Sequence, residues 1–165
     1  MRSWWWLGGL AVAVAACDPE VEDACQQAST LSARLELGTG IEDFERPIAD
    51  GDLVQVAYGM QGGQHVWMGV RTTGLLPGQH RTLGNDRDVP VFELQLLDED
   101  GLVQGEQTFD FFAMSGTAEE ATLALGTFFV PFQDEGTKRE WTLVGEGVDV
   151  CGTIVEDEHP VLLRW

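Results

Sequence analysis

The sequence has little positive charge. Among its 165 residues, 9 are Lys or Arg and 28 are Asp or Glu, which gives a formal net charge of −19 at pH 7. A surface of this charge repels nucleic acid and anionic lipid headgroups, so we expect no nucleic-acid partner. The chain is still 44% hydrophobic, enough to build a core, and it is therefore not a disordered acidic tail.

Residues and motifs typical of catalysis are also scarce. The serines that follow residue 17 are Ser29, Ser32 and Ser115, and none lies in a G-x-S-x-G motif. The histidines are His65, His80 and His159, and no H-E-x-x-H motif contains any of them. The sequence has no phosphate-binding loop and no dinucleotide fingerprint. We therefore expect neither an enzyme nor a bound cofactor.

No apolar run is long enough to cross a bilayer as a helix. The longest, Trp4 to Ala16, has 13 residues, whereas a span needs about 20. With Arg2 before it and small residues at its end, the run fits a secretory signal peptide over residues 1–16. Cleavage after Ala15 would leave Cys17 as a free thiol near the new terminus, whereas cleavage after residue 16 would make Cys17 the first residue.

The stretch Val14-Ala15-Ala16-Cys17 resembles the lipobox of bacterial lipoprotein precursors, with Val14 where that family prefers Leu. The resemblance implies that the Cys17 thiol carries a diacylglyceryl group and that the new amine is acylated too. It implies a protein of the bacterial cell envelope, held on a membrane by lipid and facing the periplasm or the exterior. It covers residues 1–17 only, so the envelope protein or ligand that the rest of the chain binds stays unknown.

The cysteine count supports this interpretation. The chain has three cysteines, Cys17, Cys25 and Cys151, and an odd number leaves one thiol unexplained in an exported protein. If Cys17 carries lipid, the other two remain as a pair in an oxidising compartment. In VDVCG, Asp149 and Cys151 share one strand face. Because Asp149 is charged, this face is expected to be exposed or near a rim of the sheet. We expect a Cys25–Cys151 disulfide; the alternative is two unpaired thiols.

Residues 31–165 show the period-two alternation of β-strands. Residues 17–30 form an acidic tether, in which Asp18-Pro19 could start a helical turn, or which could equally be extended. About eight strands are predicted, over residues 31–37, 52–58, 64–70, 91–97, 102–113, 122–130, 139–152 and 161–165. Gly- and Asp-rich turns separate them, which predicts one all-β domain, an antiparallel Ig-like sandwich.

The end of the chain resembles the last strands of Ig-like domains of bacterial surface proteins. These strands often carry a W-x-L…V-x-D-x-x-G pattern. The matching residues are Trp141, Leu143, Val148, Asp149 and Gly152. This resemblance implies a fold and no particular activity.

Two sets of side chains could form binding sites. His65 and Trp67 share a face of one predicted strand and suggest a surface aromatic patch for a partner. Calcium needs six to eight oxygen ligands from several segments. A weak calcium site could form only if Asp98 and Asp100 met Glu156 and Asp157; otherwise these are solvated acidic groups. We therefore expect a non-catalytic interaction or structural module, or alternatively a module that binds a cation or small ligand through acidic loops.

Overall fold

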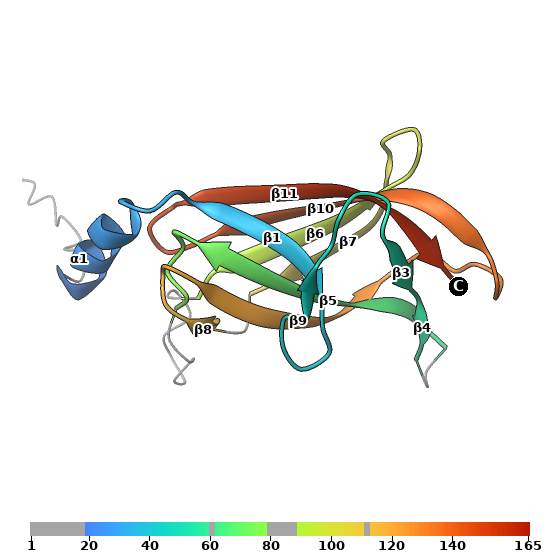
Figure 1. Cartoon of the computed structure of the whole chain (residues 1–165), viewed down its shortest axis with the longest axis horizontal. Helices are drawn as coiled ribbons and strands as arrows, with labels where there is room; N and C mark the ends of the chain where they lie inside the picture. Colours follow the sequence, from blue (N-terminus) through green and yellow to red (C-terminus); the bar gives the residue numbers. More distant parts are fainter. Residues whose placement is uncertain (1–18, 60–61, 79–88, 111–112) are drawn as a thin grey trace, which may run out of the picture.

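The computed structural model describes residues 19–59, 62–78, 89–110 and 113–165, which form one short helix and eleven strands (Figure 1). In chain order the elements are α1 (Pro19–Ala28), β1 (Arg34–Thr39), β2 (Arg46–Pro47), β3 (Leu53–Gln55), β4 (Ala57–Tyr58), β5 (Gln64–Thr73), β6 (Val91–Leu97), β7 (Val103–Phe109), β8 (Ser115–Gly116), β9 (Ala121–Phe129), β10 (Lys138–Val148) and β11 (Ile154–Arg164).

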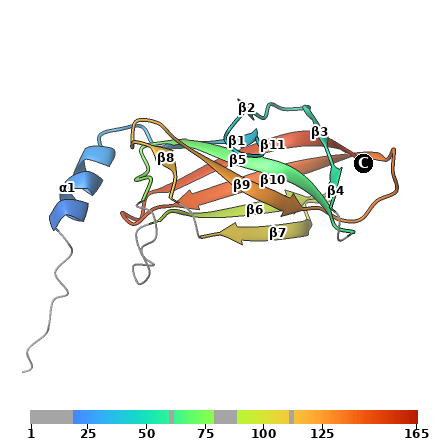
Figure 2. The same ribbon diagram turned by 90° about the horizontal axis from the view of Figure 1, so that it is seen from below.

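The strands form two sheets that lie over each other as two layers (Figure 2). Sheet A has the order β2-β1-β5-β9-β8, with β4 also paired to β5, and sheet B has the order β3-β11-β10-β6-β7. The predicted all-β sandwich is confirmed. Pairs between described strands are antiparallel except for β3 and β11, which run parallel and were not predicted to do so. β1 of sheet A lies beside β11 of sheet B, and we call this line of contact the seam.

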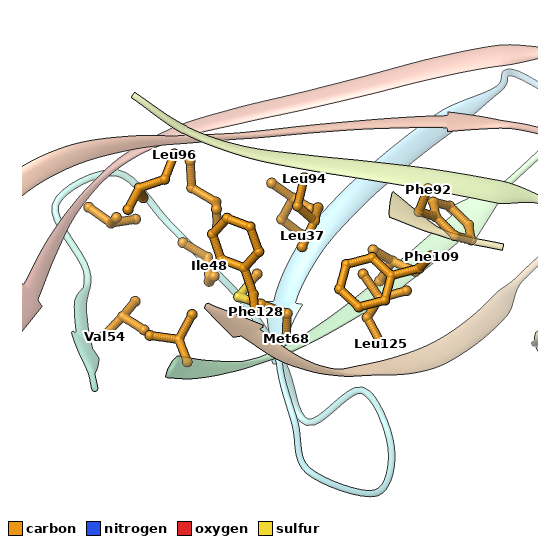
Figure 3. Packing of buried hydrophobic residues seen from close by; sticks show 14 of the residues in the cluster. Leu37, Ile48, Val54, Met68, Phe92, Leu94, Leu96, Phe109, Leu125 and Phe128 are labelled. Carbon is orange, nitrogen blue, oxygen red and sulfur yellow. The ribbon is translucent and has the colours of Figure 1, made fainter. Parts of the chain in front are cut away.

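Alternating apolar residues from both sheets fill the space between the layers. On β6, Phe92, Leu94 and Leu96 point inward and are at most 1% exposed. They face residues of sheet A that include Leu37 and Phe128 (Figure 3). The intervening β6 residues are more exposed. The sequence alternation of β6 predicts this arrangement, with one face of the strand toward the core and the other toward solvent.

A β-bulge changes which β9 residues enter the core. The sequence pattern groups Leu123 and Leu125 with Phe129 on one side of the strand. The register of the β5–β9 pair shifts before Gly126, whose φ of +92° suits glycine. The extra residue reverses the alternation beyond this point. Phe128 is therefore fully buried, and Phe129 is 57% exposed.

Two predicted strands differ most from the structure in their bounds. The segment predicted as one strand over residues 52–58 is divided into β3 in sheet B and β4 in sheet A. The chain changes sheets at Val56, whose N–H donates to the carbonyl of Arg164 at 2.8 Å. Tyr58 is therefore 51% exposed, although its spacing places it with the buried Val54 and Val56. The last strand begins at Ile154, seven residues before its predicted start.

Candidate functional site

The acidic segment before the sandwich is a helix, the first of the two possibilities that its sequence allows. In α1, Pro19 takes the first helical position, where its missing N–H costs nothing. Glu20 and Glu22 lie in the first turn, where negative charge is favourable for the helix dipole. After the last turn, the Ser29 hydroxyl donates to the carbonyl of Gln26 at 2.8 Å, which satisfies one free carbonyl of the helix end.

A disulfide joins α1 to the turn between β10 and β11. It links Cys25 to Cys151, whose Cα atoms are 5.6 Å apart, and the predicted pairing is confirmed. Within α1, Ala28 is the one described residue that is buried. The helix lies at one end of the long axis of the molecule (Figure 1). The disulfide is therefore its main attachment to the sandwich.

A buried carboxylate shapes the turn that carries Cys151. Asp149 was expected on a face that is exposed or near a rim; it lies in the turn just after β10, but its side chain is not exposed, at 6%. One of its oxygens accepts the N–H groups of Cys151 at 3.0 Å and Thr153 at 2.9 Å. The other accepts the N–H of Leu76 at 2.9 Å. Three backbone donors compensate the burial of this carboxylate and hold the disulfide turn in place.

The seam contains a histidine between two carboxylates. His159 and Asp157 lie on the core-facing side of β11, within an otherwise apolar series. The His159 Nδ1 atom is 2.8 Å from an oxygen of Asp50, and its Nε2 atom is 3.2 Å from Asp157 Oδ2. The same Asp157 oxygen accepts the N–H of Leu37 in β1 at 2.7 Å. The network therefore connects both sheets with the segment between β2 and β3.

The two carboxylates change the acid–base behaviour of the ring. Partial burial lowers the pKa of His159, but the hydrogen bond to Asp50 and the negative charges of Asp157 and Asp50 together outweigh it, so the pKa lies above 6.5. Nearby, a guanidinium nitrogen of Arg46 donates to Asp52 Oδ2 at 2.6 Å. This hydrogen bond holds the pKa of Asp52 below its ordinary value.

His65 and Trp67 contact each other, but His65 is not a surface group. Their ring centroids are 5.2 Å apart, and the Phe129 ring is 6.3 Å from His65. His65 is 7% exposed, whereas Phe129 is 57% exposed. The predicted patch therefore presents Phe129 and part of Trp67 to solvent, with His65 packed beneath them.

The acidic residues considered for calcium do not come together. Asp98 and Asp100 occupy the β6–β7 turn, where Asp98 accepts two backbone N–H groups of the turn and the amide of Gln104. Glu156 and Asp157 lie within β11 rather than in a loop, and Asp157 belongs to the seam network. In the described ranges no group of three His, Cys, Asp or Glu side chains is arranged to hold a metal ion.

A polar cavity of about 560 Å³ lies beside the β6–β7 turn. Glu99, Asp100 and Glu140 line it together with Arg139, and Trp141 forms part of its wall. The turn lies at the end of the sandwich opposite α1 (Figure 2). The cavity is large enough for a small molecule.

Three glutamates form a row across the outer face of sheet B. Glu146 of β10 lies directly opposite Glu93 of β6 on one side and Glu156 of β11 on the other. Like charges in directly opposite positions repel one another. Only the register of the three strands brings these glutamates into one row.

Several predicted features lie outside the described residues, among them the signal peptide, Cys17 and His80. Over the part of the chain that the structure covers, no helix has the length and apolar character needed to cross a membrane.

No protein-family model and no curated protein sequence matches the chain. Among solved structures, the chain is similar to CopC from Methylosinus trichosporium OB3b, at 14% identity and a TM-score of 0.34, over 70% of this chain and 85% of that one. It is also similar to self-complemented MyfA, the major subunit of Myf fimbriae from Yersinia enterocolitica, solved in complex with galactose. That match has 12% identity and a TM-score of 0.32, over 79% of this chain and 98% of that one. Similarities this distant support no conclusion about this chain.

Proposed function

We propose that the protein is a bacterial envelope lipoprotein, attached to a membrane by lipid on Cys17, with a non-catalytic β-sandwich that presents a surface to an envelope partner. One observation carries the proposal: Cys25 and Cys151 form a disulfide. Cys17 is then the one cysteine without a partner in the chain, and it follows an apolar run of signal-peptide length.

Lipid supplies a membrane affinity that the domain itself lacks. Removal of residues 1–16 takes away one positive charge, Arg2, so the formal charge becomes −19 − 1 = −20. Such a domain is repelled by anionic headgroups. Each buried CH₂ of an acyl chain contributes about 0.8 kcal/mol, and two or more chains give stable anchoring.

If Cys17 carries the lipid, the disulfide supports an orientation with the α1 end of the sandwich near the membrane. Seven residues separate Cys17 from Cys25, so even a fully extended link spans at most about 27 Å. Anchoring at Cys17 therefore keeps the α1 end close to the bilayer. The C-terminus and the β6–β7 turn then face away from it (Figures 1 and 2), and the cavity lies beside that turn.

The described histidines support a non-catalytic role. Both ring nitrogens of His159 contact carboxylates, so neither is free to take a proton from a substrate. His65 packs against aromatic rings and is nearly inaccessible. A cation site in the acidic loops is not favoured, because Asp98 and Asp157 already accept hydrogen bonds from the protein.

Fractionation of bacterial cells tests the proposal. We expect the wild-type protein in the membrane fraction and the Cys17→Ser variant in the soluble extracytoplasmic fraction or as an uncleaved precursor. Cys25→Ser is the matched control: it removes a cysteine eight positions away and should leave membrane attachment intact. Equal membrane association of wild type and of a Cys17→Ser protein that has lost residues 1–16 would contradict the proposal.

A further inference from the structure

The seam network ties together three segments that are far apart in the sequence. Asp157 on β11 accepts the N–H of Leu37 in β1, which joins sheet B to sheet A at 2.7 Å. His159 links the same carboxylate to Asp50, which lies between β2 and β3. The network thus joins a surface segment to a strand of each sheet, and the imidazole ring is its link to the surface segment.

Backbone hydrogen bonds place the Asp50 segment directly on β11. The N–H of Gly51 donates to the carbonyl of Pro160 at 2.7 Å, and the N–H of Leu162 donates to the carbonyl of Asp52 at 2.9 Å. Ile48, just before this segment, is 2% exposed and belongs to the core. Separation of the segment from β11 would therefore break these two hydrogen bonds and uncover a core side chain.

The geometry favours a doubly protonated ring. Each ring nitrogen lies within hydrogen-bonding distance of a carboxylate oxygen, and an ionised carboxylate can only accept. A neutral imidazole has one N–H, so it would direct a lone pair at one of the two carboxylates. Loss of one proton therefore replaces a charge-assisted hydrogen bond by a repulsive contact.

The ionisable groups around the ring come from two directions. Asp50 and Asp52 face it from the β2–β3 segment, and Arg46 neutralises Asp52 at 2.6 Å. Asp157 faces it from β11 itself. Among described neighbours on the other strands, β1 supplies the backbone N–H of Leu37, which donates to Asp157. Strand β10 places the apolar Leu143 opposite His159. The two unneutralised carboxylates thus control the proton on the ring.

We propose that Asp50, His159 and Asp157 form a proton-operated latch on the seam, closed while the imidazole carries both ring protons and loosened when it loses one. The closed form binds the proton more tightly than the open form, in which the imidazole has the ordinary histidine pKa near 6.5. Closure is therefore fully favoured below pH 6.5 and weakens as the pH rises through the higher pKa of the closed form. The device makes the β2–β3 segment responsive to the pH of its compartment.

Hydrogen exchange on the intact protein tests the latch. The protection factors of the Gly51 and Leu162 amides, corrected for the intrinsic rate at each pH, should fall as the pH rises above about 6.5 and through the raised pKa of the closed form. The fold-change in protection should equal the ratio of the proton affinities of the closed and open forms, which NMR titration of the ring measures separately. The Gly74 amide, which donates to Ala118 at 2.7 Å far from His159, should keep its protection.

Variants separate the latch from a general effect of charge. Asp50→Asn should lower the pKa of His159, measured by NMR of its ring protons, and should reduce the pH response of Gly51 and Leu162 at least threefold. Glu158→Gln removes the same charge from the opposite face of β11 and should leave both readouts near wild type. A wild-type His159 pKa at or below 6.5, or protection factors independent of pH, would overturn the proposal.

Discussion

Removal of the disulfide should destabilise the protein strongly while leaving both sheets in place. The bond closes a loop of 126 residues, and in the chain-entropy model this raises the free energy of unfolding by about 5 kcal/mol. Because Ala28 is the one residue of α1 with described burial that is buried, detachment of the helix removes few other contacts from the folded state. We therefore expect the Cys25→Ser, Cys151→Ser double variant to lose about 3–5 kcal/mol.

Urea unfolding monitored by circular dichroism measures this loss. A domain of this size has about 5–15 kcal/mol of stability, so the variant should stay folded at room temperature. Its melting temperature should fall by roughly 6–20 °C, at about 2–4 °C per kcal/mol. Reduction of the wild type should produce the same change, and reductant should not affect the variant. A loss below about 1 kcal/mol would refute the chain-entropy argument for this bond.

Three other changes test the core, the seam and the outer face. Phe128→Ala should cost about 3–5 kcal/mol, whereas Phe129→Ala should cost less than about 1 kcal/mol; similar costs in urea unfolding would mean that the bulge at Gly126 is absent. The folded-state pKa of His159 is raised, so its contribution to the free energy of unfolding is complete below pH 6.5 and is lost as the pH rises through that pKa; Asp50→Asn should flatten this decline, and a steeper decline would contradict the sign. Glu146→Gln should raise the free energy of unfolding by about 0.3–1 kcal/mol by relieving repulsion from Glu93 and Glu156; an increase that does not shrink at high salt would exclude repulsion as the cause.

The sequence pattern predicts those elements whose surroundings are uniform along the strand. The prediction for β6 agrees with the structure at both ends, because its core-facing residues alternate without interruption. The pattern fails at Gly126, where an inserted residue reverses the faces of β9. It also fails in β11, because Asp157 and His159 occupy core-facing positions and hide the alternation of Val155, Val161 and Leu163. A period-two pattern detects buried apolar side chains. It does not detect a polar side chain that is buried together with its hydrogen-bonding partners.

The sites depend on residues that are far apart in the chain. The disulfide is predictable because the number of cysteines left only one pairing once Cys17 was set aside. No comparable count links Leu37, Asp50 and His159, since their meeting depends on how the two sheets are packed. The burial of Asp149 is likewise hidden, because a carboxylate in a turn is normally exposed unless several backbone N–H groups compensate it.

Mass spectrometry of the N-terminal peptide, isolated from the membrane fraction of the producing bacterium, tests lipid anchoring most directly. We predict a peptide that begins at Cys17, carries the mass of a diacylglyceryl group on the thiol, and has an acylated amine. A peptide that begins at Ala16 or earlier with an unmodified Cys17 would contradict the proposed anchoring.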